Sequence, residues 1–194
     1  RFGDSDDSDN GIIIYSHGSS PFMRFFTNGG ERLRVLSGGG LTFNGDTATA
    51  NALDDYEEGT WTPTYIGSSS NPTVTFDIQV GIYRKVGGLV HAMFSMRTDA
   101  ASGGSGSLFV SGLPFAGATT SNAFYSGSIG YVAGFTTVAP QAIHIGSNGT
   151  TIVLLTHGSS DGRGSLSTNV TTSNLTNSAN SNFLIGQMTY PTDA

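Results

Sequence analysis

The 194-residue chain contains no cysteine, and only 11% of its residues are charged. Without cysteine it can have neither disulfides nor thiolate metal sites, so its stability has to come from packing and association. The net charge is −6, and the eight Lys and Arg residues form no basic cluster, which argues against nucleic-acid binding through phosphates. No apolar run approaches the roughly 20 residues needed to cross a bilayer, so we expect no membrane insertion.

Small residues take the place of charged ones. The chain has 28 glycines, together with many Ser, Thr and Asn residues, and these separate short apolar runs. Closely spaced turns of this kind are typical of an all-β protein. Disorder is not expected, because disordered chains usually combine high net charge with few apolar residues. The sequence therefore predicts an all-β fold with a folded core.

The first 52 residues hold four short strand candidates, at residues 11–15, 21–26, 32–36 and 41–43. Fewer than about 50 residues cannot readily bury this many large apolar side chains on their own. We therefore predict that residues 1–52 form a short β-rich stem that intertwines with identical copies around an axis. A small-residue connector at residues 46–51 leads into the second predicted domain, residues 53–194.

Residues 53–194 are predicted to form an antiparallel β-sandwich. The strand candidates recur at sandwich spacing, at residues 61–65, 74–78, 79–86, 89–97, 108–110, 124–132, 142–145, 152–155 and 183–190. Gly87 and Gly88 separate two alternating runs, as in a tight hairpin. In the second run, His91 lies opposite a predicted buried face that consists of Val90, Ala92, Phe94 and Met96. We expect residues 101–107 and most of residues 162–180 to form loops.

An acidic cluster, Asp54, Asp55, Glu57 and Glu58, precedes the only tryptophan, Trp61. Glycoside hydrolysis requires two carboxylates at a defined separation, so these acids are candidates for such a pair. Adjacent acids more often form a solvated turn, and no nucleophile motif G-x-S-x-G is present. We therefore predict that the protein is not an enzyme and has no catalytic residue.

Metal binding is not predicted either. The four histidines, His17, His91, His144 and His157, lack metal-ligand spacing. The acidic run Asp4, Asp6, Asp7 and Asp9 suits a calcium loop in its oxygen ligands, but it lacks the Gly and Glu of an EF-hand, so we expect a solvated linker. The sequence thus predicts no metal and no cofactor. One alternative stays open for His91: symmetry-related copies of it could surround an oligomer axis and hold a metal ion or an anion.

Several motifs together resemble a recurring C-terminal domain of bacteriophage tail fibres and related virion proteins. These are EEGTWTP at residues 57–63, the pattern Q-x-G-x-Y-x-K-x-G-x-x-V at residues 79–90, and GLPF at residues 112–115. Residues 23–46 are similar to the stem repeats that precede such domains, although they are more aromatic. The resemblance extends from about residue 11 to residue 190.

The resemblance implies a homotrimeric fibre with a jelly-roll-like head, similar to tumour-necrosis-factor-like trimers. The expected location is the virion surface, on a tail or capsid appendage. The N-terminal segment would contact other virion proteins, and the head would recognise a host cell-surface glycan or protein. Aromatic rings near amides suit sugars, so the candidate receptor-binding residues are Phe115, Asn122, Phe124, Tyr125 and Phe135.

Two other functions stay open. One is a purely structural virion protein, such as a capsid decoration or head-fibre component without a receptor. The other, more remote, is a polysaccharide-degrading tailspike that uses acids of the cluster at residues 54–58.

Overall fold

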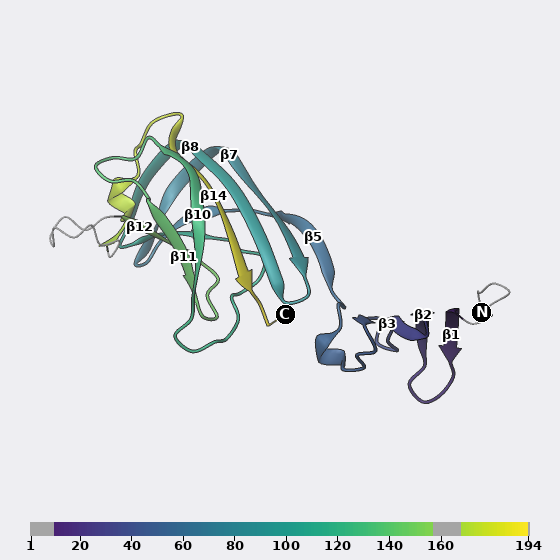
Figure 1. Cartoon of the computed structure of the whole chain (residues 1–194). Helices are drawn as coiled ribbons and strands as arrows, with labels where there is room; N and C mark the ends of the chain where they lie inside the picture. The colour runs from purple at the N-terminus through teal and green to yellow at the C-terminus, as the bar shows by residue number, and fades with distance from the viewer. Residues whose placement is uncertain (1–9, 157–167, 194) are drawn as a thin grey trace. The chain divides into compact units, whose positions relative to one another are not determined.

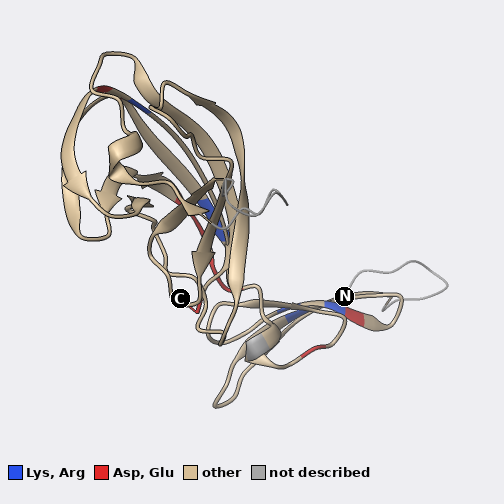
Figure 2. Cartoon of the chain, turned by 90° about the vertical axis from the view of Figure 1, so that its left-hand side faces the viewer, with Lys and Arg blue, Asp and Glu red and all other residues tan. Residues whose placement is uncertain are grey.

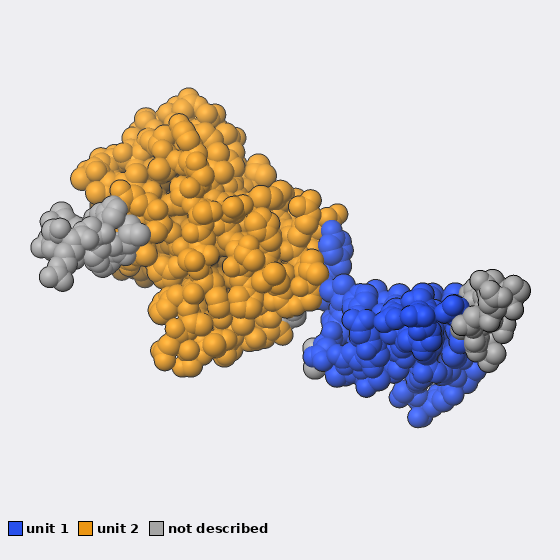
Figure 3. Space-filling model, in the orientation of Figure 1, with its two compact units in different colours: residues 1–56 blue, residues 57–194 orange. Residues whose placement is uncertain are grey.

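A computed structural model describes residues 10–156 and 168–193 of the chain. The expectations for His157 and for Asp4, Asp6, Asp7 and Asp9 concern residues outside this part. The predicted all-β fold is confirmed, because the described residues form strands and only two single turns of 3-10 helix, η1 (Thr49–Asn51) and η2 (Thr172–Asn174). The chain divides into two compact units, Arg1–Tyr56 and Glu57–Ala194 (Figure 3). The predicted boundary lay between residues 52 and 53.

The N-terminal unit, residues 1–56, contains one antiparallel four-stranded sheet in the order β1-β2-β3-β4. Its strands are β1 (Gly11–Ser16), β2 (Phe22–Thr27), β3 (Gly30–Val35) and β4 (Leu41–Phe43). The four predicted strands are thus confirmed. Asn28 and Gly29 form the β2–β3 turn with φ of +52° and +67°, the left-handed conformation that tight hairpins require.

The N-terminal unit has a sheet but no core of its own. Among the side chains that the structure describes, every buried apolar one belongs to the C-terminal unit. A sheet with apolar residues is normally stable only when a second layer covers them. A second layer over this sheet would therefore stabilise the unit.

The C-terminal unit, residues 57–194, contains one antiparallel sheet of ten strands that curls over a core (Figure 1). The strand order is β5-β7-β8-β14-β10-β11-β12-β9-β6, with β13 paired to β12, and β6 also lies against β7 and β8. The two halves of the sheet thus form the two layers of a sandwich. The strands are β5 (Tyr56–Trp61), β6 (Thr64–Gly67), β7 (Ser70–Val86), β8 (Leu89–Ser105), β9 (Leu108–Ser111), β10 (Phe124–Ala133), β11 (Ala142–Gly146), β12 (Ile152–Thr156), β13 (Thr168–Asn169) and β14 (Ser181–Pro191).

Three predictions in this unit are wrong, and they concern one strand, one pair of strands and one loop. Residues 61–65 are not one strand, because Pro63, which has no N–H to donate, lies between β5 and β6. Residues 74–78 and 79–86 belong to the single strand β7, and the predicted loop at residues 101–107 is mostly strand β8. These two strands pair along their whole length, from Val86 and Leu89 at the turn to Ser70 and Ser105 at the far end. Backbone pairing therefore overrides the loop-like composition of residues 101–105.

The predicted core face of β8 is confirmed. Val90, Ala92, Phe94 and Met96 are each at most 3% exposed. Tyr65 is also buried, and its hydroxyl donates a hydrogen bond of 3.0 Å to the backbone oxygen of Asn182. Asn182 is fully buried, with φ of +49°, and its side-chain amide donates to Thr98 Oγ1 and to the backbone oxygen of Thr176. Apolar packing and this polar cluster together fix the inside of the curled sheet.

Candidate functional site

The outer surface of the C-terminal sheet carries two cross-strand rows of side chains. Successive residues of a strand point to opposite faces, so the residues that alternate with the β8 core face point outward. Strand pairing over β7, β8, β14 and β10 aligns these outward residues into neighbouring rows. We call the two rows the outer face: Val80, Ser95, Ile185 and Tyr131, and then Ile82, Met93, Gln187 and Ser128.

The outer face is apolar and exposed. The exposed fraction is 53% for Val80, 50% for Tyr131, 39% for Ile82 and 38% for Ile185. Seven of its eight residues line a hollow of about 430 Å³: Val80, Ile82, Met93, Ser95, Ser128, Ile185 and Gln187. The largest apolar patch on a monomeric protein is often functional. This face is therefore the main candidate functional site.

Charged residues border the outer face and do not enter its two rows. Beside one row, Arg97 Nε donates a hydrogen bond of 2.8 Å to Asp77, and this bond holds the pKa of Asp77 below its ordinary value. Beyond the other row, Arg84 Nε lies 3.5 Å from a carboxylate oxygen of Glu58. Charged residues are sparse along the strands of the whole unit, whose ribbon is mostly tan in Figure 2. An uncharged centre with a charged rim is the usual composition of a protein interface.

His91 lies next to the outer face, in a row with Arg84 and Thr189. Its Nδ1 is 2.9 Å from the Thr189 hydroxyl, and the ring borders a second hollow of about 330 Å³ that Glu58 and Met93 also line. The structure thus places His91 on the face opposite the core, as the alternation predicts. Its role at an oligomer axis stays a prediction.

Three of the five candidate receptor-binding residues pack against the core: Phe115, Tyr125 and Phe135. The ring of Phe115 lies 5.6 Å from that of Tyr83, and the ring of Phe135 lies 6.3 Å from that of Tyr65. The Tyr125 hydroxyl donates a hydrogen bond of 3.1 Å to the backbone oxygen of Ala118. These rings serve mainly to fill the sandwich.

The other two candidates, Asn122 and Phe124, lie at the surface. Asn122 is exposed in a turn with φ of +59°, and Phe124, at the start of β10, is 72% exposed. The Phe124 ring contacts His144 on β11 edge to face, with ring centres 5.3 Å apart. Burial lowers the pKa of His144, which favours the neutral ring. Phe124 is thus the one aromatic ring of the five that is open to a ligand.

Two members of the acidic cluster, Glu57 and Glu58, do not face each other. Glu57 and Glu58 are consecutive residues of β5, so their side chains point to opposite faces. Glu57 accepts a hydrogen bond from the Tyr83 hydroxyl, which raises the pKa of Tyr83, whereas Glu58 pairs with Arg84.

The described residues show no metal centre. Among them, no group of three His, Asp or Glu side chains could hold a metal ion, and His17 contacts Tyr15, with ring centres 4.6 Å apart. None of the helical segments in this part of the chain has the length and hydropathy that crossing a bilayer takes.

Sequence reasoning missed the outer face itself. In β7 the apolar residues fall in one alternating set, from Val74 to Ile82, which indicates a single buried face. The register of β7 against β8 shifts between Thr75 and Ile78, and beyond this bulge Val80 and Ile82 of the same set lie exposed.

No protein-family model, curated protein or solved structure matches the chain. What its surfaces can bind therefore follows from their own residues.

Proposed function

We propose that the protein is a bacteriophage tail-fibre or virion appendage protein that assembles as a homotrimer. In this proposal it sits on the virion surface and recognises a glycan or protein of the host cell. The proposed assembly is supported by one observation: the outer face is exposed and uncharged, although the chain has a net charge of −6. Because copies of this chain repel one another generally, they can approach most closely where neither carries charge.

The outer face is large enough to form the centre of a self-association surface. Neighbouring strands lie about 4.8 Å apart and the two rows about 7 Å apart, so four strands and two rows cover roughly 270 Å² of sheet. A stable interface buries roughly 800 Å² per partner. In a cyclic trimer each subunit contacts two neighbours, and the outer face with its charged rim would form the centre of such contacts.

Phe124 supports the host-recognition part of the proposal. Its ring is exposed, and so are Asn122 and Ser126, two residues before and after it in the sequence. Such residues offer stacking and hydrogen bonding to a sugar or peptide. A purely structural virion protein is the second candidate, favoured by the burial of the other three candidate rings against the core.

Two measurements test the proposal. The first is the solution mass of the full chain by multi-angle light scattering over a range of concentrations; we expect a trimer, and a monomer at all concentrations would overturn the assembly. The second is binding of the labelled protein to host cells, with Phe124→Ala compared against Thr73→Ala, an exposed position on β7. Loss of binding in Phe124→Ala alone supports recognition. Absence of binding by the unaltered protein would favour the structural role.

A further inference from the structure

One face of the N-terminal sheet carries two adjoining rows that consist only of apolar side chains. Strand pairing aligns two rows of four across β1, β2, β3 and β4. We call them the open face: Ile13, Phe25, Leu33 and Phe43, and then Tyr15, Met23, Val35 and Leu41. Large and medium side chains alternate along both rows, and no residue of either row is charged.

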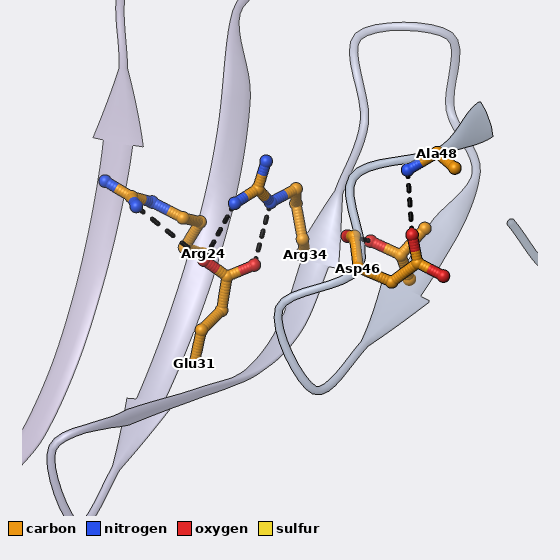
Figure 4. A network of polar contacts seen from close by, with 6 residues as sticks. Arg24, Glu31, Arg34, Asp46 and Ala48 are labelled. Carbon is orange, nitrogen blue, oxygen red and sulfur yellow. Dashed lines mark hydrogen bonds and ion pairs between the residues drawn. The ribbon is translucent and has the colours of Figure 1, made fainter. Parts of the chain in front are cut away.

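Three charged residues of this sheet, Arg24, Glu31 and Arg34, lie on its opposite face. A fourth, Arg32, donates a hydrogen bond of 3.2 Å to the hydroxyl of Thr27, at the end of β2. Arg34 donates two hydrogen bonds of 2.8 Å to the two carboxylate oxygens of Glu31, and Arg24 lies 3.6 Å from the same carboxylate (Figure 4). The bond from Arg34 lowers the pKa of Glu31. The Arg34 guanidinium also stacks 4.6 Å from the centre of the Phe22 ring. Arg24, Glu31 and Arg34 therefore pair their charges within the unit, although Arg24 Nε is buried and has no hydrogen-bond partner among the residues that the structure describes.

The open face has no such internal partner. The exposed fraction is 53% for Phe43, 51% for Tyr15, 47% for Ile13 and 37% for Met23. A hollow of about 290 Å³ opens beside Tyr15, Met23 and Val35. Full burial of one large apolar side chain contributes about 1.5–3 kcal/mol, so these four partly exposed side chains leave a driving force for association.

We propose that the open face packs against the open faces of further copies of this chain, which supply the missing second layer. The area argues for copies and against an unrelated partner. Four strands about 4.8 Å apart and two rows about 7 Å apart cover roughly 270 Å², about a third of what one partner buries in a stable interface. A face of this area forms a stable complex only when the same two molecules also contact each other through a second surface. Copies of this chain do so through the outer face, and to that extent the inference rests on the proposed self-association.

The absence of cysteine allows a direct test with matched single-cysteine variants of the full chain. Ile13 and Ile14 are consecutive residues of β1 on opposite faces, so Ile13→Cys reports on the open face and Ile14→Cys on the charged face. In a single chain the thiol at position 13 is the more exposed one and reacts faster with a maleimide. Packing against copies reverses this order, and we expect labelling at position 13 to slow by about tenfold or more above the assembly concentration.

Cross-linking gives a second readout. Packed sheets lie about 10 Å apart, which is too far for a direct disulfide. A bismaleimide that spans this distance should join two chains of Ile13→Cys and leave Ile14→Cys unjoined. Tyr15→Cys and Ser16→Cys form a second matched pair, should the first perturb folding as judged by circular dichroism.

The outcomes separate this inference from the proposed function. Fast labelling at position 13 in a sample that light scattering shows to be a trimer would overturn the inference and leave the trimer standing. Slow labelling in a monomeric sample would mean that the same chain covers the face, and would overturn both. Slow labelling that becomes fast on dilution, together with cross-links at position 13, supports the inference.

Discussion

Replacing Val80 with lysine tests whether the outer face joins the copies. Val80 is 53% exposed, so docking recovers roughly half of the 1.5–3 kcal/mol that full burial of such a side chain contributes, about 1 kcal/mol. A lysine there must also lose part of its hydration or bend its ammonium toward water, at a further cost of a few kcal/mol. At 1.4 kcal/mol for each tenfold change, we expect association to weaken by at least about a hundredfold.

Lysine is chosen because it reduces the net charge, so dissociation of Val80→Lys cannot come from greater general repulsion. Thr75→Lys, at an exposed position of the same strand, is the matched control with the same charge change. Unfolding free energies of both variants should stay within about 0.5 kcal/mol of the original, because neither site is in the core.

Light scattering over a dilution series measures the assembly midpoint, and thermal unfolding followed by circular dichroism measures stability. We expect Val80→Lys to dissociate at concentrations at which Thr75→Lys remains assembled. Equal assembly midpoints for the two variants, with both folded, would refute the assignment of the outer face.

Three further predictions concern the fold and its pH dependence. Gly81→Ala places a Cβ 2.7 Å from the Trp61 ring, and this overpacking should cost about 1–3 kcal/mol of stability, visible in denaturant unfolding followed by Trp61 fluorescence. Asn182→Ala removes three buried side-chain hydrogen bonds and should cost at least about 3 kcal/mol in the same assay, whereas an unchanged midpoint would contradict the role of this residue. The hydrogen bond from Arg34 lowers the pKa of Glu31 in the folded state, so ionised Glu31 stabilises the fold at pH values above its ordinary pKa of 4.5. This stabilisation is lost as the pH falls from 4.5 through the lower pKa of the folded state. In a circular-dichroism titration, Glu31→Gln should therefore lose less stability than the original chain over this acidic range.

The sequence predicts local strand positions well where side chains alternate and turns are marked by glycine. The β7–β8 hairpin is an example, because Gly87 and Gly88 occupy its turn and the alternation after them identifies the buried face of β8. The extent of these strands could not be predicted in the same way. Residues 101–105 are Ala, Ser and Gly, which favour loops on their own, and their pairing with β7 depends on main-chain bonds that composition does not encode.

The candidate contact residues show a second limit. Phe124 and Tyr125 are consecutive aromatic residues of β10, and one is exposed while the other packs against the core. Which of the two faces outward depends on the register of β10 against β11, and a shift of one residue would exchange them. Likewise, Val80 and Tyr83 both look like core residues in the sequence, and only the folded sheet shows that Val80 lies outside.

The two apolar faces belong to one chain, and this predicts that they act together. Copies that meet at one face hold the other at an effective concentration that reaches millimolar for short connections, so even the small open face then contributes. We therefore expect Val80→Lys and Ile13→Lys each to raise the assembly midpoint measured by light scattering, and the double variant to raise it by about the product of the two factors. A double variant that assembles as well as Val80→Lys alone would show that the open face takes no part. A single variant at either face that abolishes all assembly would show that the other face cannot join copies unaided.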